Sequence, residues 1–374
     1  MSAITVVAAW NTAVMRITFI LPVFSRLPSG GFRVVYEYAN RLTARGHRVT
    51  VVHEQWYEGW HRPLKHLREI ARDRWHDRRP GGLADWLRWM PIDPAVRMTM
   101  VTKLDARELP EGDVVVATYW TTARLLPLLA PEQGRPLHLV QGYEVWGVDD
   151  PTEVDAVLRS DVPKVAVSGY LACLLEDLGV PRGRVSVVRN GLDHSVYRPP
   201  TPDGPRGTSV SVLAGSGPQK GTATVVAALE RVREQLPDLR VNAFGAEKRP
   251  SVLPGWMGYS RARNGREQAS RAYRASAVHL CGSVQEGWGF PVAEAMACGT
   301  AVVTTRNGGV EDFCADGRNS LLVDVGDADG MAGAVLRLLR DGESRRRLVE
   351  SGLRTAASMD WEESADSFLA ALRP

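Results

Sequence analysis

The sequence predicts an α/β protein of two domains, each built on a parallel sheet. Runs of β-branched and apolar residues alternate with helix-forming runs, which is typical of parallel strands joined by covering helices. A chain of 374 residues is long for one domain and suits two of roughly 150 to 200 residues. A segment rich in proline and glycine at 197–208 separates the two halves and predicts the linker.

The first half begins with residues 1–14, which lack a basic n-region and make a poor signal peptide. We expect them to be an N-terminal extension. The first strand, at 17–21, leads into a loop with Gly30 and Gly31 and then into a helix. This order offers free backbone N–H groups to a phosphate, and a tight turn between strand and helix is the alternative explanation.

A later strand of the first half ends near residue 140 and leads into the polar loop Gln141-Gly142-Tyr143-Glu144. Open α/β folds bind ligands at the carboxyl ends of their strands. Gln141 and Glu144 are therefore candidates for contact with a ligand, and a structural helix cap is the alternative. Asn190 and Gly191, after another short strand, are a strong turn signal and predict a hinge.

The second half begins with a strand at 209–213 and a glycine-containing loop at 215–217, followed by Lys220. Lys220 stands where the dinucleotide fingerprint G-x-G-x-x-G needs its third glycine, so the loop fits that fingerprint poorly. We expect helices at 222–235 and 266–275 and strands near Val241 and Val278.

The composition and charge of the chain argue against several classes of function. The formal net charge is only +3, which gives no signal for nucleic-acid binding. The sequence contains no run of 18 apolar residues that would predict a membrane span, and no His/Cys spacing that would predict a metal site. Four scattered cysteines without a paired framework favour reduced thiols and a cytoplasmic protein.

The run from Ser283 to Gly299 carries two carboxylates around a helix start. Glu286 lies in a turn with Gly287 and Gly289, which allow a ligand close to the backbone, and Pro291 suits the first turn of a helix. We therefore place Glu294 in the first turn, near free N–H groups. A sugar linked to a nucleoside diphosphate would suit two such acceptors on either side of its phosphates. The alternative is a buried loop with one capping and one solvated glutamate.

The whole run resembles the donor-site signature of the retaining family 4 glycosyltransferases, roughly S-x-x-E-G-F-G-L-P-x-x-E-A-M-A-x-G, with Trp288 and Phe290 for the usual Phe and Leu. The resemblance covers most of the chain and implies the GT-B fold, two Rossmann-like domains facing a cleft. It implies an acceptor domain at 15–200 and a nucleotide-sugar donor domain at 201–360. A last helix at 361–374 would pack back on the first domain.

The resemblance also implies roles for the site residues. Glu294 would accept from the ribose hydroxyls and Glu286 from the sugar hydroxyls, and Lys220 would stabilise the departing diphosphate. Backbone groups of the following residues would also face the donor: Gly30, Gly31, Gly287, Gly289, Phe290 and Pro291. Gln141 and Glu144 would contact the reacting sugar or the acceptor. For Asn190 a donor contact is the alternative to a hinge.

Two departures from the family pattern stand out. Rhamnosyltransferase-like relatives have Gln-Asp-Tyr-Glu where this chain has Gly142 in place of the aspartate. Family members also carry an arginine shortly before Lys-Gly, where this chain has Gly215 or Ser216. Either Lys220 carries more of the phosphate charge, or another arginine, such as Arg33 or Arg306, takes that place.

The segment 56–90 is unusual, since it holds five of the eleven tryptophans and a basic run from Arg62 to Arg79. A solvated helix face packed by aromatic residues is one interpretation. An acceptor site or a peripheral membrane contact is the other, because cationic segments with tryptophan bind anionic lipid surfaces.

Taken together, we expect a retaining, metal-independent glycosyltransferase without a separate cofactor. Its donor would be a UDP-, GDP- or dTDP-linked sugar, and its acceptor a glycan or a small molecule. The alternatives are a GT-B sugar-nucleotide epimerase, a phosphorylase-like enzyme and a non-catalytic sugar-binding scaffold.

Overall fold

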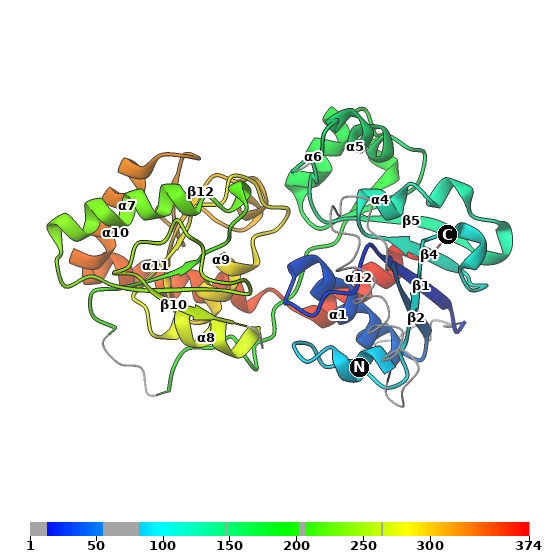
Figure 1. Cartoon of the computed structure of the whole chain (residues 1–374), viewed down its shortest axis with the longest axis horizontal. Coiled ribbons are helices and arrows are strands. Elements are labelled where there is room, and N and C mark those ends of the chain that lie inside the picture. The colour runs from blue at the N-terminus through cyan, green and yellow to red at the C-terminus, as the bar shows by residue number, and fades with distance from the viewer. Residues whose placement is uncertain (1–12, 55–81, 147, 202–205, 263–264, 374) are drawn as a thin grey trace, which may run out of the picture.

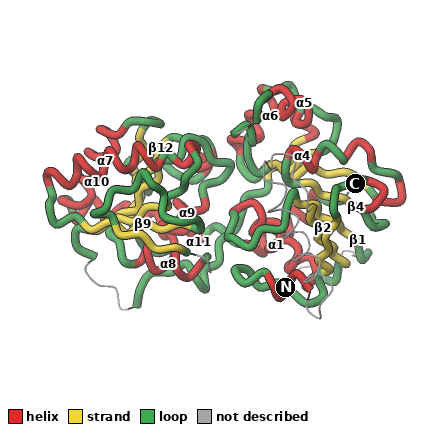
Figure 2. The backbone as a smooth tube through the Cα atoms, in the orientation of Figure 1, coloured by secondary structure: helices red, strands yellow, loops and turns green. Residues whose placement is uncertain are grey.

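The computed structural model describes residues 13–54, 82–146, 148–201, 206–262 and 265–373. They form two α/β domains that lie side by side (Figure 1). Strands and helices alternate along each domain (Figure 2). The predicted fold class, with two Rossmann-like parallel-sheet domains, is confirmed.

The first domain holds a seven-stranded parallel sheet in the order β3-β2-β1-β4-β5-β6-β7. Strand addition reverses between β1 and β4, and crevices at such switch points are where open α/β sheets bind ligands. All residues of β1 after Arg16 are buried, as expected for a central strand covered on both faces. The strands are β1 (Arg16–Leu21), β2 (Arg48–Glu54), β3 (Arg97–Val101), β4 (Val114–Ala117), β5 (Arg135–Val140), β6 (Lys164–Ala166) and β7 (Val185–Val187). The helices are α1 (Gly30–Ala44), α3 (Gly82–Trp86), α4 (Trp120–Ala123), α5 (Pro151–Leu158) and α6 (Gly169–Asp177).

The second domain repeats this plan with six parallel strands in the order β10-β9-β8-β11-β12-β13. Its switch point lies between β8 and β11. The helix expected at 222–235 has the same bounds in the structure. The strands are β8 (Ser209–Leu213), β9 (Arg240–Gly245), β10 (Gly258–Arg261), β11 (Val278–Cys281), β12 (Ala301–Thr305) and β13 (Leu321–Val323). The helices are α7 (Thr222–Gln235), α8 (Arg266–Arg274), α9 (Phe290–Ala297), α10 (Ala328–Arg340) and α11 (Gly342–Ala357).

The last helix, α12 (Trp361–Ala371), follows the second domain in sequence but packs on the first (Figure 1). The ring of Phe368 stacks on Tyr38 of α1 with centroids 4.2 Å apart, and the Tyr38 hydroxyl lies 3.0 Å from Ser364 Oγ. Where α12 begins, an added Cβ at Gly191 would come within 2.3 Å of the Trp361 nitrogen. The segment that leads out of the first domain and the segment that returns to it therefore lie in close contact, and Leu192 and Asp360 form a β-bridge there.

Most of the segment 56–90 lies outside the described residues, including its basic run. Of its tryptophans, Trp86 and Trp89 are described. Trp89 is 5% exposed and donates from Nε1 to the Ser25 carbonyl, and Trp86 packs against Phe24. These two side chains belong to the packing of the first domain.

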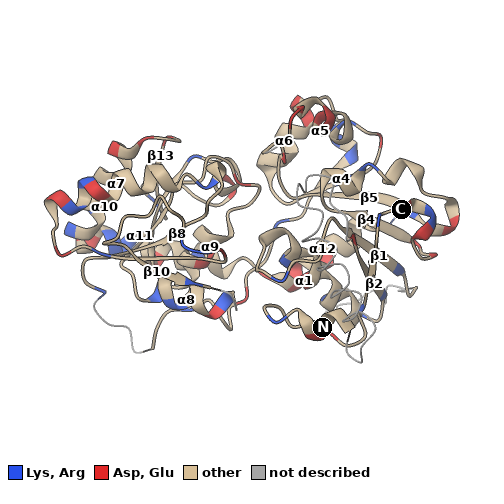
Figure 3. Cartoon of the chain, viewed as in Figure 1, with Lys and Arg blue, Asp and Glu red and all other residues tan. Residues whose placement is uncertain are grey.

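Charges of both signs are spread over the outer helices of the two domains (Figure 3). This agrees with the small formal net charge of +3. Within the described ranges, no helix has the length and apolar composition needed to cross a bilayer.

Candidate active site

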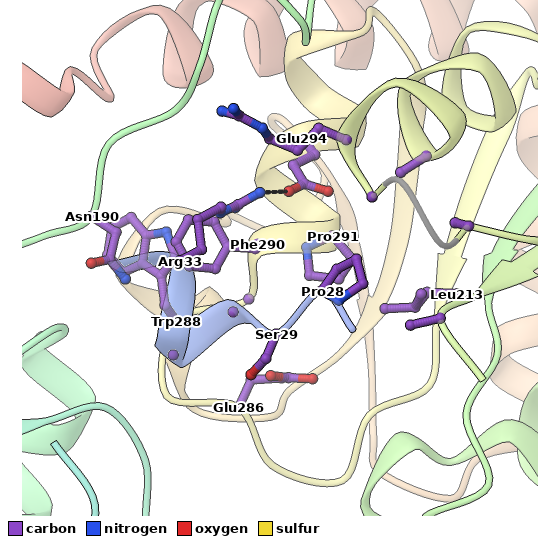
Figure 4. Close-up of a pocket in the computed structure, with 18 of the residues that line it drawn as sticks. Pro28, Ser29, Arg33, Asn190, Leu213, Glu286, Trp288, Phe290, Pro291 and Glu294 are labelled. Carbon is purple, nitrogen blue, oxygen red and sulfur yellow. Dashed lines mark hydrogen bonds and ion pairs between the residues drawn. The ribbon is translucent and has the colours of Figure 1, made fainter. Parts of the chain in front are cut away.

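Two adjoining cavities lie where the carboxyl ends of the two sheets face each other. The first cavity has a volume of about 250 Å³ and is lined by residues 28–31 and Arg33, by Asn190 and Tyr197, and by Lys220, α8, 286–291 and Glu294 of the second domain. Figure 4 shows a close-up of its lining.

The second cavity has a volume of about 420 Å³. It is lined by the ends of β1, β4 and β5 and, across from them, by residues 219–220 and 285–287. Six residues line both cavities: Ser29, Gly31, Gln141, Lys220, Glu286 and Gly287. The two cavities therefore meet at Lys220 and Glu286.

Two helix amino termini, one from each domain, point toward the first cavity. An added Cβ at Gly30, the first residue of α1, would lie 3.4 Å from the ring of Phe290, the first residue of α9. Gly289, the N-cap of α9, has φ 98° and leaves 2.5 Å between an added Cβ and Val310, so only glycine fits there. Free N–H groups and the positive ends of two helix dipoles make this point suitable for an anion.

The Glu294 carboxylate is buried and holds one partner from each domain. Its Oε1 accepts from Arg33 Nη1 at 2.7 Å, and its Oε2 accepts from the Tyr273 hydroxyl at 3.0 Å. Its placement in the first helical turn was wrong. Because α9 begins at Phe290, Glu294 is the fifth helical residue and is held by side chains instead of helix N–H groups.

Arg33 lies on α1, and its side chain reaches the second domain. Its guanidinium carbon stands 3.9 Å above the Phe290 ring centroid, and the side chain is only 10% exposed (Figure 4). Burial is the largest single effect and lowers the pKa of Arg33, but the charge and hydrogen bond of Glu294, together with Tyr197 and Glu37, outweigh it and the net shift is upward. A permanent cation therefore lies above the start of α9.

Lys220 and Glu286 form a second ion pair at the junction of the cavities. Lys220 Nζ lies 2.8 Å from Glu286 Oε1, which also accepts from Ser283 Oγ at 2.8 Å. Burial is the largest single effect and lowers the pKa of Lys220, but the charge and hydrogen bond of Glu286, with a smaller effect of Cys281, together raise it above its ordinary value. Gly221 continues the chain with φ 57°, and an added Cβ would collide with the Gly282 carbonyl oxygen.

Gln141 and Gly287 bring the two domains into backbone contact. Gln141 donates from Nε2 to the Gly31 carbonyl at 3.0 Å. An added Cβ at Gly287 would come within 1.9 Å of the Gln141 carbonyl oxygen. A glycine is therefore required at Gly287 for this closed arrangement.

Glu144 lines the second cavity, and its carboxyl group forms a hydrogen bond to a backbone group. Its Oε2 accepts from the Trp120 N–H at the start of α4, at 3.0 Å. Burial raises the pKa of Glu144 to about 8, and the Trp120 hydrogen bond offsets only part of this shift. The capping role is thus present in the structure, and the carboxyl group also faces the cavity.

Asn190 is 3% exposed and lines the first cavity. Its Oδ1 is buried without a hydrogen-bond partner among the described residues. A ligand group that donates a hydrogen bond would satisfy it. Among the residues that the structure describes, no three His, Cys, Asp or Glu side chains come together as a metal site would require.

Comparison with known proteins decides the family. A family model described as "Glycosyl transferases group 1" matches residues 208–341. The alpha-maltose-1-phosphate synthase of Mycolicibacterium smegmatis is 32% identical over 285 residues, which cover 66% of this chain and 70% of that protein. The D-inositol 3-phosphate glycosyltransferase of Nocardiopsis dassonvillei is 26% identical over 315 residues, 71% of this chain and 72% of that protein.

The chain is a group 1 glycosyltransferase. Solved structures agree with its GT-B fold. Sucrose-phosphate synthase from Thermosynechococcus elongatus superposes with a TM-score of 0.73 at 18% identity, covering 95% of this chain and 97% of that one. Anabaena HepE, solved in complex with UDP-glucose, gives 0.72 at 14% identity, covering 95% and 99%.

In this glycosyltransferase, the structure brings nearly all the sequence-predicted site residues to the two cavities. Arg306 is the exception among the suggested replacement arginines, because it pairs with Asp316 at 3.5 Å and lines neither cavity. Tyr197 and Tyr273 had been missed. Both line the first cavity. In the sequence, however, Tyr273 follows the apolar spacing of α8 and Tyr197 lies in the linker, so no sequence pattern indicates that either one belongs to a ligand site.

Proposed function

We propose that this glycosyltransferase transfers a sugar from a nucleoside diphosphate to a hydroxyl group of a glycan or small molecule, with retention and without a metal ion. One observation carries the proposal. Two helix amino termini and two carboxylate–cation pairs meet at the first cavity, which opens into the second at Lys220 and Glu286.

The donor would lie along the first cavity. Glu294 would accept from the ribose hydroxyls, and the diphosphate would lie between the starts of α1 and α9, near the N–H groups of Gly30 and Phe290. Glu286 would then hold hydroxyl groups of the sugar at the junction of the cavities. The positions of the two glutamates support this order, because Glu294 lines only the first cavity and Glu286 lies where the first cavity meets the second.

The chemistry follows from charge. When the glycosidic bond breaks, negative charge grows on the diphosphate, and fixed cations and N–H dipoles near that charge are usually a large part of catalysis. Lys220 and the two helix starts would supply this stabilisation where other glycosyltransferases use a metal ion. Glu286 is engaged by Lys220 and Ser283, which suits holding the sugar better than attacking it. We therefore favour attack on the leaving-group face, with retention.

The acceptor would enter through the second cavity. Its lining combines aromatic side chains, Tyr119 and Trp146, with Gln141 and Glu144. Aromatic rings with hydrogen-bonding groups at their edges suit a polyhydroxy compound. The names of the relatives, with inositol phosphate and maltose phosphate, support this acceptor chemistry.

The four cysteines are free thiols, which supports a reducing compartment such as the cytoplasm. A vesicle-binding assay of the full chain with anionic lipids at low salt tests the membrane contact proposed for 56–90.

The test is release of nucleoside diphosphate from UDP-glucose, GDP-mannose and dTDP-rhamnose, with and without myo-inositol or glucose as acceptor. We expect slow hydrolysis of one donor, faster release with a matching acceptor, an unchanged rate in EDTA, and retained configuration by NMR of the product. Loss of activity in EDTA would contradict the proposal that the enzyme works without a metal ion. Epimerised donor formed without acceptor would favour the epimerase, and binding without turnover would favour the scaffold.

A further inference from the structure

A diphosphate carries more than one negative charge, so we expect a second cation beside Lys220 in the first cavity. The loop before Lys220 does not provide one. Residues 215–219 are Gly-Ser-Gly-Pro-Gln. Among the described residues that line the first cavity, the cations are Lys220, Arg33 and Arg266. Lys220 lies at the junction with the second cavity, on the sugar side of the expected diphosphate.

Arg266 pairs through Nη1 with two carboxylates that lie outside the cavities. Its Nη1 lies 2.6 Å from Asp193 and 3.4 Å from Glu37, neither of which lines the cavities. Two carboxylates therefore already neutralise this arginine. That leaves Arg33 as the cation with access to the start of α9.

Arg33 combines three features of a ligand-binding arginine. It stands above Phe290, the first residue of α9, and it is the fourth residue of α1, so both helix starts are near its guanidinium. Its residue is 8% exposed, and its buried Nε has no hydrogen-bond partner among the described residues. Its Nη1 is held by Glu294, the carboxylate that the proposed function assigns to the ribose.

We propose that Arg33 is the second cation for the donor diphosphate and that it is supplied by the first domain. Without donor it pairs with Glu294. When the donor binds, its ribose hydroxyls donate to Glu294 and displace Arg33 Nη1 from it. The guanidinium then donates to phosphate oxygens from Nη1 and from Nε. The donor then replaces the direct Arg33–Glu294 contact between the domains with a charge-assisted contact through its diphosphate. This inference rests on the proposed function.

A structural role for Arg33 is the competing explanation, and the phosphate dependence of binding separates the two. The experiment titrates the full-length wild-type protein with UDP, GDP and dTDP, and then compares the tightest of them with its own nucleoside. In Arg33→Gln we expect affinity for the diphosphate to fall by about tenfold or more, as for a lost hydrogen bond to a charged group. Affinity for the nucleoside should change far less. Arg33→Lys, which keeps the charge, should lie between.

Arg41→Gln is the matched control, because Arg41 lies on the same helix, also pairs with a buried glutamate and lines neither cavity. Its diphosphate and nucleoside affinities should equal those of the wild type. If Arg33→Gln weakens diphosphate and nucleoside equally, or weakens neither, the proposal is overturned. A wild-type protein that binds none of the three diphosphates would instead overturn the proposed function.

Arg33→Gln could unfold the chain by leaving Glu294 without its cation. The double variant Arg33→Met with Glu294→Gln removes both charges and is compared with Glu294→Gln alone. A smaller ratio of diphosphate to nucleoside affinity in the double variant supports the proposal, and an equal ratio overturns it.

Discussion

The carboxyl groups of the two cavities differ in whether they pair with a cation. In the first cavity, Glu294 and Glu286 each lie within 3 Å of a cation, at 2.7 and 2.8 Å. In the second cavity, Glu144 has no cation as a partner among the described residues and accepts from the Trp120 N–H, and burial raises its pKa to about 8. The first cavity is a set of balanced ion pairs, and the second holds a carboxyl group that stays neutral over most of the physiological range.

This difference indicates what each cavity can bind. An anion that enters the first cavity competes with the carboxylates for cations already in position, so the cations need not be ordered on binding. A neutral carboxyl group, by contrast, can donate as well as accept a hydrogen bond. The second cavity therefore suits the hydroxyl groups of an acceptor, and four variants test this division.

Lys220→Ala should have the largest effect. It removes the cation that lies where the cavities meet, and charge stabilisation of a leaving group is typically worth about 10² to 10³ in turnover. Turnover at saturating donor is the measurement. Lys248→Ala, at an exposed lysine of the same domain that lines neither cavity, is the control. Equal rates for both variants would contradict the assignment of Lys220.

Glu294→Gln should weaken nucleoside binding by about tenfold, because a neutral amide replaces a charged acceptor for the ribose hydroxyls. Titration with the nucleoside alone isolates this contact from the diphosphate. Glu286→Gln is the comparison, since it should alter turnover of the sugar nucleotide and leave nucleoside affinity unchanged. The opposite pattern would exchange the two roles.

Glu144→Gln should change how stability depends on pH. The unfolded carboxyl group loses its proton near its ordinary pKa of 4.5, while the folded one keeps it to about 8. Between these values the folded state binds more protons, so wild-type stability falls as pH rises, and the loss is absent below 4.5.

The advantage of Glu144→Gln over the wild type should therefore grow from pH 4.5 to pH 8, by on the order of 1 kcal/mol or about 2–4 °C in Tm. Thermal unfolding across this range is the measurement, with exposed Glu132→Gln as control. A difference between the Tm values of variant and wild type that does not vary with pH would show that Glu144 is charged in the fold.

Asp312→Ala should have the smallest effect. Asp312, in the second domain, accepts from the N–H groups of Gly169 and Tyr170 at the start of α6, at 2.8 and 3.1 Å, pairs with the exposed Arg189 at 3.1 Å, and lines neither of the two cavities. Loss of such a cap typically costs about 1 kcal/mol. Chemical denaturation should detect it, with Asp312→Asn intermediate. A loss of turnover as large as that of Lys220→Ala would show that the cavities do not hold the catalytic groups alone.

Much of the site could be predicted because its signals are local. Gly289 and Pro291 are read from neighbouring residues, and α7 was predicted with its observed bounds. The position of Glu294 in α9 differs from the prediction by one residue, because the helix begins at Phe290, one residue before the proline, and Glu294 falls just beyond the first turn.

The sequence by itself determined the two parallel α/β domains, the order of their elements and the run from Ser283 to Gly299, since side-chain periodicity and glycine positions act over a few residues. Only the tertiary structure decided which charges pair. Arg33 and Glu294 lie 261 residues apart and meet because both sheets point their carboxyl edges at one cleft and α12 fixes the domains together. The neutral state of Glu144 likewise depends on burial by distant segments, which a local pattern cannot encode.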